Sequence, residues 1–216
     1  HHYGIQYYYG TVLDTWNGFC ARPSFLDLFK SKTAPAVSES DLFDNSKMKG
    51  YYNSDLRGPG TELQGTSNTK NWGWFVGQVN KKGSATELYL DEDVVDADNP
   101  KGTPTVLHVG VSSLTNAHNF DGARLNKWEL DKTGTYKYCE NDFHVFRYAD
   151  VLWMKIEAVL RGGAGSVSSV TSSADFKTLM ARSFAYDPNP EQAFRDAYGD
   201  VDSWTLDDVL AERGRE

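Results

Sequence analysis

The stretch NDFHVFRYADVLWMKIEAVLRGG, residues 141–163, decides the fold of this chain. It opens with the extended segment DFHVF and passes directly into a helix. Along that helix, five apolar residues recur at three- and four-residue spacing: Tyr148, Val151, Leu152, Ile156 and Val159. This spacing puts them on one face, so it predicts an amphipathic helix with a single apolar stripe. Gly162 and Gly163 follow it, as is typical of helix C-terminal ends.

The residues that follow predict two more helices. A Gly- and Ser-rich linker spans residues 162–173, and the helices on its two sides are expected to pair as a hairpin. Ser173 stands at the N-cap position of the helix ADFKTLMARSFA. The next segment, DPNPEQAFRDAYGDVDS, is predicted to be a loop that holds a helical turn. Thr205 precedes the helix LDDVLAERGRE, and Asp208 three residues later makes a pattern close to a capping box.

Upstream of residue 141 the chain is irregular, with short strands. Apolar groups alternate over residues 3–9 as they do in a strand, and Ser24 is a candidate N-cap for the short helix FLDLF. Residues 31–70 carry clusters of Pro, Gly, Ser and Asn, which favour loops. Short strands are predicted between residues 71 and 130, in WGWFVGQV, ELYL, PTVLHVGV and ARLNKWEL.

The composition of the 216-residue chain narrows the classes of function. A formal net charge of −8 and a pI of about 5.1 argue against nucleic acid and anionic membranes as partners, because both require a basic surface. No segment approaches the roughly 20 apolar residues of a membrane helix. The sequence has no signal peptide or initiator Met and stops inside a helical pattern, so we expect a piece of a longer protein.

Cysteines, histidines and acidic residues form no pattern typical of a metal or cofactor site. Cys20 and Cys139 either form a bridge or stay as two thiols, and the second alternative is favoured. The five histidines are scattered without zinc-ligand spacing. The acidic run at residues 91–100 lacks EF-hand spacing, which favours a solvated loop over a calcium site. We therefore predict no metal and no cofactor.

Charged residues on the helix after residue 146 have two interpretations. Arg147, Asp150 and Glu157 could form a catalytic cluster, since Asp150 and Glu157 are two turns apart on one face. Charged residues beside an apolar stripe more often form ion pairs or caps that stabilise the fold. We favour the structural interpretation.

Aromatic residues make up 13% of the chain, and many lie in Gly- and Asn-rich stretches. Sugars present flat C–H faces and hydroxyl rims, so a stacked ring and a planar polar group can bind them together. The residues that we predict to contact such a ligand are Tyr8, Tyr9, Trp16, Asn17, Tyr52, Arg57, Trp72 and Trp74. The alternative is that these rings pack under long loops as small satellite cores.

Several motifs together resemble one protein family. FRYADVL at residues 146–152 is followed by Met154 and by Glu157-Ala158, and the chain ends with TLDDVLAERGRE. Upstream, WNGFCARPSFLDLF and YYNSDLRG add less specific similarity. The pattern is similar to that of SusD/RagB proteins over essentially the whole chain. It departs from that family at the middle helix, where SFAYDPNP stands.

The resemblance implies a mainly α fold with irregular loops and short strands, in which tetratricopeptide-type helix pairs pack against a loop-rich region. We expect residues 1–216 to be a single C-terminal region, truncated at both ends, with a loop-rich part at 1–140 and a helical part at 141–216. The family implies a non-catalytic, surface-exposed outer-membrane lipoprotein whose lipid anchor lies upstream. It would bind oligosaccharides and pass them to a SusC-like TonB-dependent transporter.

Two other functions stay open. A glycoside hydrolase would need two carboxylates held about 5–10 Å apart. The chain has 30 acidic residues, and no local motif selects a pair. A peptide-binding or scaffold protein of the RagB type would instead use the helices for protein partners and leave the aromatic residues structural.

Overall fold

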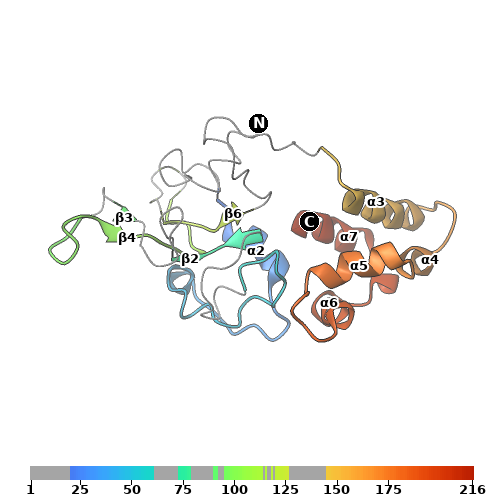
Figure 1. Cartoon of the computed structure of the whole chain (residues 1–216), viewed down its shortest axis with the longest axis horizontal. Coiled ribbons are helices and arrows are strands. Elements are labelled where there is room, and N and C mark those ends of the chain that lie inside the picture. The colour runs from blue at the N-terminus through green and yellow to red at the C-terminus, as the bar shows by residue number, and fades with distance from the viewer. Residues whose placement is uncertain are drawn as a thin grey trace.

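The computed structural model describes residues 20–60, 73–78, 90–91, 95–113, 115, 118, 120–126 and 145–216. We call the described residues of 20–126 the loop-rich part and residues 145–216 the helical part. The helices of the helical part lie together on one side of the molecule, and the short strands lie on the other (Figure 1). The predicted fold class, mainly helical with a few short antiparallel strands, is confirmed.

The helical part consists of helices that pack in pairs. Its elements are α3 (Tyr148–Leu160), α4 (Val167–Thr171), α5 (Ala174–Arg182), α6 (Pro190–Tyr198), the 3-10 turn η5 (Val201–Ser203) and α7 (Leu206–Arg215). Contacts join α3 to α4 and α7, and α5 packs on α6. Ser173 accepts a hydrogen bond from the amide of Phe176 at 3.3 Å, and Thr205 and Asp208 form a capping box. The predicted N-caps of α5 and α7 are thus confirmed.

The buried face of α3 differs from the predicted apolar stripe. Its buried residues are Ala149, Leu152, Trp153 and Ile156. Tyr148 and Val151, which belong to the predicted stripe, are 58% and 38% exposed. The predicted stripe and the buried residues both follow three- and four-residue spacing, because α3 carries apolar residues around most of its circumference. Trp153 decides between them, since burying its large ring removes the most apolar area from water.

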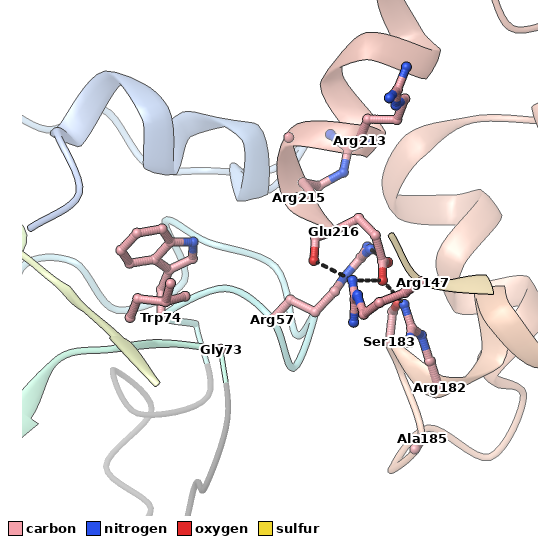
Figure 2. Close-up of a pocket in the computed structure, with 12 residues that line it drawn as sticks. Arg57, Gly73, Trp74, Arg147, Arg182, Ser183, Ala185, Arg213, Arg215 and Glu216 are labelled. Atoms are coloured by element: carbon pink, nitrogen blue, oxygen red, sulfur yellow. Dashed lines mark hydrogen bonds and ion pairs between the residues drawn. The ribbon is translucent and has the colours of Figure 1, made fainter. Parts of the chain in front are cut away.

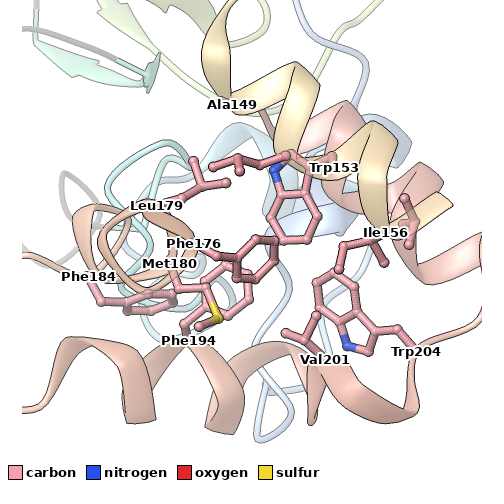
Figure 3. Close-up of a cluster of buried hydrophobic side chains, with 12 residues drawn as sticks. Ala149, Trp153, Ile156, Phe176, Leu179, Met180, Phe184, Phe194, Val201 and Trp204 are labelled. Atoms are coloured by element: carbon pink, nitrogen blue, oxygen red, sulfur yellow. The ribbon is translucent and has the colours of Figure 1, made fainter. Parts of the chain in front are cut away.

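Trp153 lies at the centre of the core of the helical part (Figure 3). Its ring meets Phe176 edge-on at a centroid distance of 4.8 Å and stacks on Trp204 at 5.5 Å. Phe194 from α6 stacks on the same ring at 6.4 Å. The buried residues come from α3, α5, α6, η5 and α7, so one aromatic core joins these elements into a unit.

Two segments predicted to be loop or linker are helical. The helix α6 begins at Pro190, a residue favoured at the first helical position, and ends before Gly199, whose φ is 91°. The helix α4 lies inside the predicted linker and starts with a capping box of Ser166 and Ser169. The sequence pattern does not distinguish these helices from loops, because Gly, Ser and Pro punctuate loops but also begin and end helices.

Short helical segments begin the loop-rich part. The helix α2 (Pro23–Leu26) runs into the 3-10 turn η2 (Asp27–Phe29), and a second turn, η3, spans Ser40–Phe43. Arg22 occupies the N-cap position of α2 and Pro23 its first turn, so Ser24 lies inside the helix. The predicted Ser24 cap is therefore wrong, because proline at the first helical position sets the start of this helix.

The strands of the loop-rich part form two-stranded antiparallel pairs. The pairs are β1 (Gly73–Phe75) with β6 (Arg124–Asn126), β2 (Gly77–Gln78) with β5 (Val106–Leu107), and β3 (Leu90–Asp91) with β4 (Thr103–Pro104). A strand overlaps each of the four segments predicted between residues 71 and 130, and in ELYL the overlap is Leu90 alone. The predicted strand at residues 3–9 lies outside the described residues. The loop-rich part has a second core, which includes Leu26, Phe29, Met48, Val76 and Val109.

Three further features bear on sites that the sequence left open. Cys20 is a half-buried free thiol, and Cys139 lies outside the described residues.

In the acidic run, Asp96 accepts hydrogen bonds from the amides of Asp98 and Asn99 at 2.9 and 2.7 Å, which forms an exposed turn. Within the described part of the chain, no cluster of His, Cys, Asp and Glu is suited to a metal ion, and no helix has the length and apolarity to cross a membrane.

Candidate functional site

The loop-rich and helical parts meet at a polar junction. The amide of Leu56 donates to the carbonyl of Ser183, just after α5, at 2.8 Å. The side-chain amide of Asn53 donates to the hydroxyl of Tyr198 at 3.1 Å. Contacts between η2 and α7 complete the junction. Residues 53–57 therefore connect the loop-rich part to the helices.

Arg57 lies at the centre of this junction, surrounded by carboxylates. Its Nη2 is 2.7 Å from Asp55 Oδ2, and its Nη1 is 2.7 Å from Glu212 Oε1 and 3.1 Å from Glu216 Oε2. The side chains of all four residues are buried. Burial alone would raise the pKa of Asp55, but the charge and hydrogen bonds of Arg57 outweigh burial and hold that pKa below its ordinary value. The junction is therefore a buried network of ionised groups.

Arg215 and Tyr198 extend the network on the helical side. Arg215 Nε donates to Glu212 Oε2 at 2.6 Å, and its guanidinium carbon lies 3.8 Å from the centre of the Tyr198 ring. The Tyr198 hydroxyl donates to Asp55 Oδ2 at 2.8 Å. Burial, followed by the charge of Asp55, raises the pKa of Tyr198, so its hydroxyl stays protonated and remains a donor.

Glu216 is the point at which three arginines converge. Its carboxylate accepts from Arg57, from Arg147 at 2.6 Å and from Arg182. The Glu216 side chain is 2% exposed, whereas those of Arg147 and Arg182 are 23% and 42% exposed. Burial would raise the pKa of Glu216, but hydrogen bonding and charge from Arg182, with the charges of the other two arginines, lower it. The ionised carboxylate holds the guanidinium groups in place.

A pocket of about 730 Å³ lies beside these arginines, between the two parts of the molecule. Its lining residues are Arg57, Gly73, Trp74, Leu125, Arg147, Arg182, Ser183, Ala185, Arg213, Gly214, Arg215 and Glu216. Figure 2 shows Trp74 on the side of the loop-rich part and the arginines of the helical part across from it. Its volume is within the roughly 300–1,000 Å³ that is typical of small-molecule sites.

The position of Trp74 depends on the glycine before it. The Trp74 amide donates to the carbonyl of Arg57 at 2.7 Å, and the indole meets Phe25 edge-on at a centroid distance of 5.4 Å. Gly73 has a φ of +90°, and a Cβ there would lie 2.6 Å from the carbonyl oxygen of Leu56. Only glycine satisfies both conditions. Gly73 thus allows β1 to approach residues 56–57 and places the indole at the pocket.

The structure brings together two of the predicted ligand-binding residues, Arg57 and Trp74, which both line this pocket. Tyr52 does not line it. Tyr52 is buried in the core of the loop-rich part, where its ring meets Tyr51 edge-on at 4.9 Å, and its role at a ligand site stays a prediction. The remaining predicted residues lie outside the described part of the chain: Tyr8, Tyr9, Trp16, Asn17 and Trp72.

The pocket also contains residues that the sequence patterns do not single out: Arg182, Arg213, Arg215 and Glu216. A signal for part of this group is present in α7. Val209, Glu212 and Glu216 are three and four residues apart, so two carboxylates share a helix face with an apolar residue. Charges on a buried face require partners. The spacing could therefore have indicated a buried ion network, but not the identity of its cations.

The charged residues of α3 make structural contacts. Asp150 Oδ2 accepts from the amide of Arg147 at 2.8 Å and thereby caps the helix. Glu157 binds Arg161 at 2.9 Å within α3 and Arg213 at 2.8 Å in α7. These are contacts of the structural kind favoured for Asp150 and Glu157, whereas Arg147 also lines the pocket.

The comparisons with known proteins address the whole chain. No curated protein and no solved structure matches it. The family model described as the SusD family matches residues 2–216, which include both the loop-rich part and the helical part. A match of this extent confirms the family to which the motifs at residues 146–152 and 205–216 pointed. The chain therefore belongs to the SusD family.

Proposed function

We propose that this chain binds oligosaccharides at the cell surface without catalysis, and that the pocket between its two parts belongs to the binding site. The SusD family comprises proteins that bind nutrients at the cell surface and are generally non-catalytic, which supports the class of function. The observation that carries the proposed site is Trp74, which lies across a pocket of about 730 Å³ from a wall of guanidinium groups.

The two walls of the pocket offer the two kinds of contact that a sugar needs. The Trp74 indole can stack on the C–H face of a sugar ring. Arginine side chains carry N–H donors and no acceptor, so they can bind sugar hydroxyl and ring oxygens. Phe25 supports the indole, and Glu216 orients Arg147 and Arg182. A site fixed before the ligand arrives loses less entropy on binding.

Glycoside hydrolysis has less support at this pocket. The reaction needs two carboxylates about 5–10 Å apart, and the acid among them needs a raised pKa. Glu216 is the acidic residue among the described lining residues, and its carboxylate is already bonded to three arginines. Despite burial, those arginines lower the pKa of Glu216, which disfavours a proton-donating role.

Calorimetric titration of the purified protein with a panel of oligosaccharides tests the proposal. Trp74→Ala should weaken binding of the tightest glycan at least about fivefold, because truncating an important contact costs more than about 1 kcal/mol. Trp74→Phe keeps a ring and should retain most of the affinity. Arg161→Ala, which removes an exposed arginine outside the pocket, is the control.

The same experiment can contradict the proposal in two ways. A Trp74→Ala protein that melts at the parent temperature and binds glycans as tightly as the parent would reject Trp74 as a contact. Release of reducing sugars by the purified parent protein would replace binding with hydrolysis.

The other predicted residues remain part of the proposed site as further contacts: Tyr8, Tyr9, Trp16, Asn17, Tyr52 and Trp72. Single alanine variants of Trp16 and Trp72 in the same titration test the two largest rings among them. If both variants bind every glycan with parental affinity, these aromatic residues are structural. Binding of peptides instead of any glycan would favour the RagB-type alternative.

We also propose that the protein is lipid-tethered at the outer membrane and delivers its ligand to a SusC-like TonB-dependent transporter. Family membership supports surface association in general terms. Co-purification of the full-length protein from detergent-solubilised outer membranes should recover the transporter, and metabolic labelling should attach a fatty acid. Recovery of the protein without a transporter would reject the partner.

A further inference from the structure

We call the pocket between the loop-rich and helical parts the junction pocket. The charged residues that line it are mostly of one sign. Among the described lining residues, Glu216 is the single acidic side chain, and the basic ones are Arg57, Arg147, Arg182, Arg213 and Arg215. The chain as a whole has a net charge of −8. The guanidinium groups are therefore concentrated at this pocket against the overall charge of the protein.

The acidic partners of several of these arginines lie outside the pocket wall. Asp55 and Glu212, which bind Arg57, are fully buried and do not line the pocket. Glu157, which binds Arg213 at 2.8 Å, does not line it either. A ligand in the pocket would thus meet guanidinium groups, with most of the compensating carboxylates behind them.

Arg147 and Arg182 are the two arginines best placed to bind an anion. Both donate to the one carboxylate of Glu216, and Arg147 also donates to the main-chain oxygen of Glu216 at 3.0 Å. A carboxylate offers about four lone-pair positions, so it can accept from both arginines and from Arg57. Beside these contacts, the Arg147 and Arg182 side chains stay 23% and 42% exposed. The partly exposed guanidinium groups of Arg147 and Arg182 therefore present positive charge to the pocket.

We propose that the junction pocket selects an acidic oligosaccharide, whose carboxylate or sulfate group binds Arg147 and Arg182 while a neighbouring sugar ring stacks on Trp74. This inference rests on the proposed glycan-binding function and specifies its class of ligand. The planar fork of a guanidinium group matches a carboxylate or a sulfate, and such charge-assisted bonds are stronger than neutral ones. The indole opposite favours a ligand that joins an anionic group to an apolar face.

Pairs of ligands that differ in charge alone test the proposal. One pair is an oligogalacturonate and its methyl-esterified form of the same length, and the second is a sulfated oligosaccharide and its desulfated form. By calorimetry at low salt, we expect the acidic member of at least one pair to bind the protein about tenfold or more tightly. Added salt should reduce this preference, because the bound charge remains close to solvent. The pair that shows the preference identifies the anionic group.

Variants test whether the arginines cause the preference. Arg182→Gln keeps hydrogen-bond donors but removes the charge, so it should reduce the affinity for the acidic ligand about tenfold and reduce the affinity for its neutral partner much less. Arg147→Gln should act in the same direction. Arg161→Gln, an exposed arginine outside the pocket, should change neither affinity. Melting curves of each variant separate loss of binding from loss of folding.

The possible outcomes separate this inference from the proposed function. Equal affinity for the acidic and neutral members of both pairs would overturn the acidic preference and leave glycan binding intact. Failure of every oligosaccharide to bind would overturn the proposed function itself. An acidic peptide that binds more tightly than any acidic oligosaccharide, and loses affinity in Arg182→Gln, would overturn the inference in favour of a peptide ligand.

Discussion

Replacing Glu212 tests whether the buried ion network holds the two parts of the molecule together. Glu212 is fully buried and accepts from Arg57 at 2.7 Å and from Arg215 at 2.6 Å. Glu212→Gln preserves the shape of the side chain and removes its charge. A glutamine amide also has only one oxygen to accept from two guanidinium groups, so its nitrogen would face a donor.

The structure sets the size of the expected effect. Removing one partner of a buried ion pair costs about 3–5 kcal/mol, because an uncompensated charge stays buried. Asp55 and Glu216 still contact Arg57, which places Glu212→Gln near the lower end, at about 3 kcal/mol. For a chain of this length, each kcal/mol lowers the melting temperature by roughly 2–4 °C, so we expect a fall of about 6–12 °C.

Differential scanning calorimetry of the parent protein and the variant measures this fall. Arg161→Ala removes an exposed ion pair and should leave the melting temperature almost unchanged. The double variant Arg57→Met/Glu212→Leu should lose less unfolding free energy than the sum of the losses in the two single variants, by at least about 1 kcal/mol. The reason is that the double variant leaves fewer buried charges unpaired. A Glu212→Gln protein that melts within about 2 °C of the parent would refute the reasoning.

Acid should weaken the same junction. Burial would raise the pKa values of Asp55 and Glu216, but neighbouring arginines hold them below the ordinary values of 3.8 and 4.5. The free energy of unfolding should therefore fall as the pH drops below those values. Identical urea midpoints at about pH 6 and pH 3 would contradict this prediction. Gly73→Ala should lower the melting temperature more than Gly50→Ala. Both glycines have positive φ, but of the two only Gly73 has main-chain atoms where a Cβ would lie. Equal falls in melting temperature for the two variants would exclude the steric cause. Trp153→Ala should reduce the free energy of unfolding by about 3–5 kcal/mol in urea titrations, and a loss under about 1 kcal/mol would show that this ring is not central to the core.

The sequence by itself determined the family and most of the helical part. The starts of α5 and α7 were predictable from Ser173 and Thr205, because capping joins residues two or three positions apart. The short strands were predictable in place but not in pairing. In each case the determining contacts are local, so they leave a pattern in adjacent residues.

Only the tertiary structure decided which face of α3 is buried and which residues form the pocket. Periodicity alone allowed two faces of α3, and contacts of Trp153 with other helices select one. Arg57 and Glu212 are 155 residues apart, and nothing in their local sequence pairs them. The pocket exists because the chain brings β1, residues 53–57 and the end of α7 together. Such contacts depend on packing between distant segments, which the spacing of neighbouring residues does not record.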